Sequence, residues 1–183
     1  AEPNWSVGAG IGWFQSSDLI GGGLGGLLGQ PFVATPGLSL ERRLNRQVSL
    51  GLGLAADFQS STGASVNLTR GSLSLAVGPR WTLTEASAPV AFSVYAAGTV
   101  GYANTSLDLP DQEALNSHSF RVGLHGGIAV ERALLRQLGL RIQLQIIRAT
   151  LDRTFAAATP AQGMTTTSLS AIPSPSIELR LSF

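Results

Sequence analysis

Residues 177–183 read IELRLSF, and this stretch decides the fold class. Successive side chains of a strand point to opposite faces. One face therefore carries Ile177, Leu179, Leu181 and Phe183, and the other carries Glu178, Arg180 and Ser182. An apolar face that ends on a terminal aromatic residue suits a wall between lipid and a polar interior. The stretch predicts a membrane-crossing β-strand.

The same alternation recurs along the chain, in segments long enough to cross a bilayer as tilted strands of about 9–11 residues. The expected strands are 5–14, 32–43, 48–59, 70–83, 90–103, 118–131, 138–151 and 168–183. In 48–59, every even position from Val48 to Phe58 is apolar, whereas the odd positions are small or polar. Segment 138–151 resembles a helix in composition, but its leucines and isoleucines alternate with polar residues at period two.

The connections between these strands alternate between short and long. Short ones are expected at 44–47, 84–89 and 132–137, and longer ones at 15–31, 60–69, 104–117 and 152–167. An up-and-down barrel with an even number of strands places both termini and all short turns on one side. The sequence predicts an all-β protein with one domain, 1–183, folded as an eight-stranded antiparallel up-and-down transmembrane barrel.

Composition excludes several classes of protein. The 183 residues are 44% hydrophobic and 13% charged, with a net charge of +1 and no clustered arginines, which argues against nucleic-acid binding. Cysteine is absent, so thiolate metal sites, disulfides and cysteine nucleophiles are excluded. No apolar window of about 18 residues predicts a membrane helix. We expect no cofactor and no metal.

The aromatic residues fall into two groups at opposite strand ends, all with the parity of the apolar face. The short-turn girdle comprises Trp5, Trp81, Phe92 and Phe183, and the long-loop girdle comprises Trp13, Phe32, Phe58, Tyr102 and Phe120. Bulky rings favour the headgroup boundary of a membrane. A soluble lipid-carrying barrel with the opposite pattern is the alternative, and it would turn these rings inward.

On these grounds the chain resembles the small eight-stranded outer-membrane proteins of Gram-negative bacteria, the OmpA-barrel, OmpX and opacity-protein type. The terminal IELRLSF looks like the signal that the barrel assembly machinery reads, carried here by Ile177, Leu179, Leu181 and Phe183. The resemblance implies an integral protein of the bacterial outer membrane with periplasmic termini. Outer-membrane lipid and lipopolysaccharide are its implied surroundings. Since the chain stops after the eighth strand, no peptidoglycan-binding domain is expected.

Inward parity near the short turns brings together charges of both signs. These lumen charges are Glu41, Arg43, Arg80, Glu131, Arg141, Glu178 and Arg180. Arginine and glutamate can pair through bidentate hydrogen bonds, and eight strands leave an interior just wide enough for side chains. These residues are therefore expected to form an ionic plug. The alternative is a selective constriction. Higher inward positions are small, including Gly51, Gly53 and Ser74, and they suggest either a packed lumen or a vestibule that holds water or a ligand.

Few residues suggest enzyme chemistry. His118 and Ser119 suggest a lipid-modifying enzyme, but as neighbours on a strand they have opposite parity. Asp108, Asp111 and Glu113 lack the spacing of a calcium loop.

The run 20–29, IGGGLGGLLG, lacks the lysine of a phosphate-binding loop. Its apolar side chains, Ile20, Leu24, Leu27 and Leu28, either cover the barrel mouth or the outer leaflet, or contact a partner protein.

The sequence therefore favours a non-enzymatic structural or interaction scaffold that acts through its extracellular loops. A narrow pore for ions or small solutes is the second hypothesis, and a lipid-modifying enzyme is the third.

Overall fold

The computed structural model describes residues 5–15, 32–62, 67–85, 88–108, 115–156, 163–171 and 173–183. These residues form nine strands: β1 (Trp5–Gln15), β2 (Phe32–Arg43), β3 (Val48–Thr62), β4 (Asn67–Thr82), β5 (Val90–Asp108), β6 (Leu115–Ala133), β7 (Leu138–Ala156), β8 (Met164–Ser170) and β9 (Ser174–Ser182). Every pairing is antiparallel. The described residues contain no helix long and apolar enough to cross a membrane.

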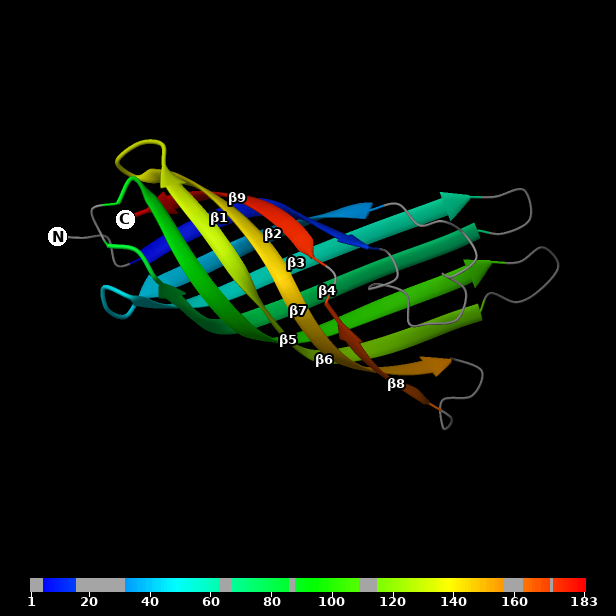
Figure 1. The fold of residues 1–183 in the computed structure, drawn as a ribbon. Helices are drawn as coiled ribbons and strands as arrows, with labels where there is room; N and C mark the ends of the chain where they lie inside the picture. The colour runs from blue at the N-terminus through cyan, green and yellow to red at the C-terminus, as the bar shows by residue number, and fades with distance from the viewer. Residues whose placement is uncertain are drawn as a thin grey trace.

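The sheet closes into a ring, which Figure 1 shows as a tilted barrel. Consecutive strands pair from β1 to β7, and β1 returns to pair with β9. β8 and β9 are two parts of the predicted eighth strand, because both pair with β7. The prediction of an eight-stranded barrel is confirmed, with the correction that its last strand breaks between Ser170 and Ser174. Pro173 lies in this break, and proline lacks the N–H that a continuous ladder needs.

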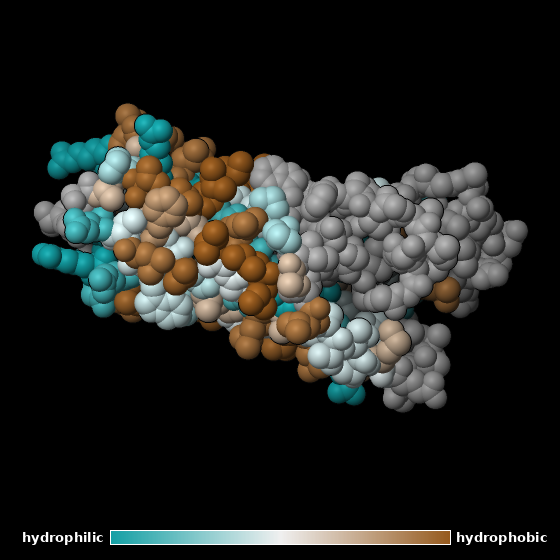
Figure 2. Space-filling view, viewed as in Figure 1, coloured by the Kyte–Doolittle hydropathy of each residue, from teal (hydrophilic) through white to brown (hydrophobic). Residues whose placement is uncertain are grey.

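The exterior of the barrel is apolar and the interior polar. Leu38, Leu75 and Val100 are among many large apolar side chains that stay exposed on the outer face, and the only buried apolar residues among those described are Ala103 and Ala129. Figure 2 shows brown hydrophobic residues over the barrel wall and teal hydrophilic residues at its short-turn end. This arrangement rejects the soluble lipid-carrying barrel and suits a wall that faces lipid.

The short connections and the C-terminus share one end of the barrel, at the left of Figure 1, where β1 also begins. Trp5 N donates to Phe183 O at 3.3 Å, and Phe183 N donates to Trp5 O at 3.0 Å, so the first and last strands join at this end. The turns after β2 and β6 are closed alike, by Leu44 N to Val48 O and by Leu134 N to Leu138 O.

At the opposite end the strands are longer than predicted. The β3–β4 ladder continues to the pair Thr62 and Asn67, and the β4–β5 ladder to Asn67 and Asp108. The expected long loops 60–69, 104–117 and 152–167 are therefore partly strand. The sequence prediction stopped where the apolar face ends, whereas backbone pairing needs no lipid and continues beyond it.

A β-bulge changes which residues of β7 face the lumen. Opposite Gly126 and Gly127 the ladder shifts register, which leaves Ile146 as an extra residue in β7. Ile146 and its neighbour Ile147 are both exposed. Beyond this β-bulge the parity of β7 is reversed, so that Thr150 and Asp152 are buried while Leu151 is exposed.

Candidate functional site

The site is the lumen, and Arg141 is at the centre of its short-turn half. Its side chain is only 3% exposed. Nη1 lies 2.8 Å from Glu41 Oε2, and Nη2 lies 2.7 Å from Glu131 Oε2. Nη1 is also 3.7 Å from Glu178 Oε2. One arginine from β7 thus links carboxylates from β2, β6 and β9.

Arg180 of β9 contacts two of these carboxylates, those of Glu131 and Glu41. Its Nη1 lies 2.6 Å from Glu131 Oε2 and its Nη2 lies 3.1 Å from Glu41 Oε2. Nη2 also donates a close hydrogen bond to the hydroxyl of Ser6 on β1. Each of these two glutamates is therefore shared by at least two arginines, which compensates the loss of water around the charges.

Arg80 of β4 joins the network through Glu41 at 3.4 Å and through Gln143, whose Oε1 accepts at 2.9 Å. Gln143 in turn donates from Nε2 to Glu178 Oε2 at 3.0 Å. The Arg80 guanidinium also lies 5.3 Å from the centroid of the Tyr95 ring, a cation–π contact. A polar chain thus crosses the lumen from β4 to β9.

Two glycines of β1 make room for this network. A Cβ at Gly8 would overlap the Glu178 carboxylate, and one at Gly10 would overlap the carbonyl oxygen of Ile177. By contrast, a Cβ at Gly53 would meet only the Cβ of Ala76, at 3.8 Å. Small inward residues therefore serve two purposes, close approach at the plug and open space above it.

The network contains three arginines and three glutamates and is balanced in charge, and we call it the plug: Glu41, Arg80, Glu131, Arg141, Glu178 and Arg180. The structure brings together six of the seven lumen charges named from the sequence. Arg43 differs, because its side chain is exposed at the last residue of β2, beside the turn 44–47. Its parity is inward, but its position at the end of β2 places it at the rim, past the part of the wall that encloses the plug.

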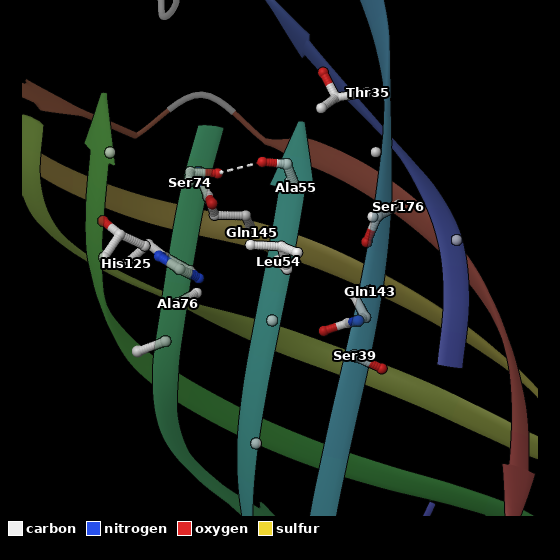
Figure 3. A pocket seen from close by; sticks show the side chains of 18 of the residues that line it. Thr35, Ser39, Leu54, Ala55, Ser74, Ala76, His125, Gln143, Gln145 and Ser176 are labelled. Atoms are coloured by element: carbon white, nitrogen blue, oxygen red, sulfur yellow. Dashed lines mark hydrogen bonds between the residues drawn. The ribbon is translucent and has the colours of Figure 1, made fainter. Parts of the chain in front are cut away.

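Above the plug the lumen holds a cavity of about 330 Å³. Its floor includes Glu41, Arg80, Arg141 and Glu178, and its walls include Gly51, Gly53, Ala55, Ser72, Ser74, Ala76, Ala97 and Thr99. Figure 3 shows small side chains from neighbouring strands around this space, with Gln143 and His125 beside them. At this level the described side chains leave space in the lumen, which water or a ligand can occupy. The expected space is present.

A second group of charges surrounds the upper part of the cavity. Arg121 Nε lies 2.5 Å from Asp152 Oδ1, and Thr150 donates to Asp152 Oδ2 at 3.4 Å. His125 is the cross-strand neighbour of Arg148, and its ring meets the Tyr95 ring edge-on at 6.0 Å. Arg70 and Asp57, on β4 and β3, are 7% and 8% exposed.

Four members of this upper group were not among the site residues named from the sequence: Asp57, Arg70, Arg148 and Asp152. The inward parity of Asp57 and Arg70 is sufficient to place both side chains in the lumen from the sequence. The parity of Arg148 and Asp152 is not sufficient, because simple alternation from Leu138 places even positions of β7 outward. The adjacent isoleucines 146 and 147 are the available signal, since two apolar neighbours break the alternation.

The residues considered for enzyme chemistry lie on opposite sides of the wall. Tyr102, an outward residue, has its hydroxyl 2.7 Å from His118 Nδ1, and their rings stack at 6.1 Å. Ser119 instead lines the cavity. No base and nucleophile meet at this pair.

The outward aromatic side chains lie on the exterior as predicted from parity. Trp5, Trp81, Phe92, Phe183, Phe58, Tyr102 and Phe120 are all exposed. Phe58, Tyr102 and Phe120 lie several residues away from the long-loop ends of their strands, a correction that follows from the longer ladders. The side chains of Trp13 and Phe32 lie outside the described residues, as do Asp111, Glu113, Ile20, Leu24, Leu27 and Leu28.

No protein-family model and no curated protein matches the sequence. Solved structures match along the whole chain. A major outer membrane protein from Thermus thermophilus has a TM-score of 0.61 and 12% identity, covering 100% of each chain. Ail, the attachment invasion locus protein of Yersinia pestis, has a TM-score of 0.52 and 10% identity, covering 99% of this chain and 96% of its own. CarO of Acinetobacter baumannii has a TM-score of 0.50 and 11% identity, covering 99% and 98%. The predicted resemblance in fold to small outer-membrane β-barrels is confirmed.

Proposed function

We propose that this chain is a non-enzymatic barrel of the bacterial outer membrane, with a closed lumen and with its contacts made by the long-loop end. The observation that carries the proposal is the plug, in which charges from β2, β4, β6, β7 and β9 meet across the lumen. Because each carboxylate in it is engaged by arginine, opening it requires several buried ion pairs to break together.

The test is single-channel recording in planar bilayers with potassium chloride. The wild-type barrel, shown to be inserted and folded, is expected to be silent. In Arg141→Ala the plug keeps three glutamates but only two arginines, so any current through this variant should favour cations. Discrete steps from the wild type, with a selectivity that changes in Arg141→Ala, would instead establish the narrow pore.

The contact role is proposed for the loops, with the apolar run 20–29 as its first candidate. The Yersinia pestis protein of similar fold is named for attachment and invasion, and for this chain contact with another surface remains a proposal. Cells displaying the intact barrel are compared with cells displaying a deletion of residues 19–29, by adherence to a matrix-coated surface. Loss of adherence with unchanged barrel mobility in unboiled SDS gels supports the role, and equal adherence overturns it.

The enzyme alternative has a direct test as well. A lipid-modifying activity would have to depend on His118, whose ring nitrogen contacts Tyr102 on the exterior. We expect no acyl transfer or lipid hydrolysis from the purified barrel in lipid vesicles. An activity that is lost in His118→Ala would contradict the proposal.

A further inference from the structure

The cavity above the plug is lined at its upper part by three arginines and a histidine. Arg70, Arg121, His125 and Arg148 line it from β4, β6 and β7. Among the described residues, the only carboxylates in the lining are Glu41 and Glu178 of the floor, and both are held by arginines of the plug. Asp57 and Asp152 are buried near this level but do not line the cavity. The charged side chains that line the upper part of the cavity are therefore arginines, while the carboxylates beside them lie outside the lining.

Arg70 is the most buried arginine of the group. It is only 7% exposed, and its Nε is buried without a hydrogen-bond acceptor among the described residues. Arg121 differs, because its Nε is already used by Asp152 at 2.5 Å. A buried donor without a partner is unfavourable, and native interiors rarely leave one. A ligand oxygen that reaches Arg70 from the cavity would supply an acceptor to its guanidinium group.

The space available limits the size of such a ligand. A volume of about 330 Å³ is at the small end of ligand pockets, which span about 300–1,000 Å³. The walls beside the arginines are built from glycine, alanine and serine, so they offer close backbone approach and hydroxyl groups. Residues of the plug form the floor of the cavity.

We propose that the lumen above the plug is a binding site for a small anion, a carboxylate, sulfate or phosphate group, held by Arg70 with Arg121 and Arg148 around it. This inference goes beyond the proposed scaffold role and does not depend on the loops. Its test is also independent of the conductance test, because a barrel that carries no current can bind an anion and a conducting barrel can fail to bind one.

The experiment follows the arginine Nε–Hε signals by NMR in the full chain, folded in a zwitterionic detergent. Inorganic sulfate and benzoate are titrated as anionic probes, and benzylammonium serves as the cation of similar size. We expect the Arg70 signal to shift and to saturate with both anions and to stay in place with benzylammonium. An Arg70 signal that does not move with either anion overturns the site, and so does an equal response to benzylammonium.

A pair of variants locates the binding. Arg70→Gln removes the inward charge, whereas Arg153→Gln removes an exposed arginine of β7 that lies over the Phe155 ring at 5.0 Å. We expect the dissociation constant for benzoate to rise at least about tenfold in Arg70→Gln, a change of about 1.4 kcal/mol, and to be unchanged in Arg153→Gln. Equal weakening in both variants would mean that net charge alone attracts the anion. If Arg70→Gln fails to fold, Arg70→Lys and the wild-type Arg70 signal decide the question.

Discussion

At the scale of single residues, the plug depends on arginines that each contact several carboxylates. Arg141 and Arg180 both lie within 3.1 Å of Glu41 Oε2, and both within 2.7 Å of Glu131 Oε2. Serine hydroxyls complete the set, since Ser49 donates to Glu41 at 2.7 Å and Ser39 donates to Glu178. The network pairs each of its carboxylates with its own arginine and serine groups, and this makes each member costly to remove.

Arg141→Ala should therefore destabilise the folded barrel by about 3–5 kcal/mol, the range for breaking a buried ion pair from one side. Glu131 and Glu41 would keep their contacts with Arg180. Glu41 would lose its 2.8 Å contact with Arg141, and Glu131 would lose its 2.7 Å contact with the same residue. The measurement is urea unfolding in lipid vesicles, followed by the shift in SDS gel mobility. Arg136→Ala, in the exposed turn between β6 and β7, is the control and should change stability by no more than about 0.5 kcal/mol. Equal effects of the two variants would show that the plug does not stabilise the fold.

The inward glycines provide a second test at this scale. Gly10→Ala should destabilise the barrel by about 1–3 kcal/mol, the usual effect of overpacking, because its Cβ would press on the β9 backbone at Ile177. Gly53→Ala should be neutral or stabilising, since its methyl group would lie in ordinary contact, 3.8 Å from the Ala76 Cβ, and glycine in a strand is less favourable than alanine by about 0.5–1 kcal/mol. The same unfolding measurement compares them. A neutral Gly10→Ala would contradict the close approach of β1 and β9.

At the scale of elements, the bulge in β7 decides which of its residues face the lumen. Ile146 is the extra residue, and beyond it the even positions, including Thr150 and Asp152, are buried. The bulge thereby brings the partner of Arg121 inside the barrel. Without it, period two would turn Asp152 toward lipid and Leu151 into the polar lumen.

Deleting Ile146 should be tolerated, because it removes the extra residue and leaves Gln145 and Arg148 on the inner face. Deleting Ala149 should prevent folding, because it moves Thr150 and Asp152 to the lipid face while Arg148 stays inside. Both variants lose one residue from the same strand, so chain length is matched. The fraction that runs as a compact band in unboiled SDS gels after refolding into lipid measures the outcome. Similar folding of the two deletions would mean that the inner face of β7 is not fixed by this bulge.

At the scale of the whole molecule, polarity is distributed opposite to that of a soluble protein. Arg141, Glu178 and Arg180 are buried, whereas Phe58, Leu124 and Leu169 are 73%, 68% and 79% exposed. A barrel with this surface needs lipid or detergent around it. Figure 2 shows the apolar band ending at the hydrophilic residues of the short-turn end.

We therefore expect the protein to remain in membranes washed with sodium carbonate or urea and to be extracted only by detergent. Unboiled samples should migrate differently from boiled ones in SDS gels, because the closed ladder from β1 to β9 resists SDS until it is heated. Release into the soluble fraction without detergent would contradict the membrane assignment.

The sequence by itself determined the all-β class, the alternation of the two faces, the ring of strands and most of the plug. The reason is local: with a side-chain period of two and a polar lumen facing an apolar exterior, each residue's environment follows from its parity. The alternation in IELRLSF and in the segment from Val48 to Phe58 assigns the two faces of each strand without knowledge of the neighbouring strands. Arg43 shows the limit, since parity gives the face but not the height along the barrel.

Only the tertiary structure decided the bulge at Ile146, the break between β8 and β9, the extension of the ladders and the cavity beside Arg70. Each of these depends on which residues of different strands meet. The bulge exists in β7 only relative to its partners in β6, and the room above the plug depends on small residues contributed by several strands at one level. Such relations depend on the register between strands, and a single strand's alternation does not contain that register.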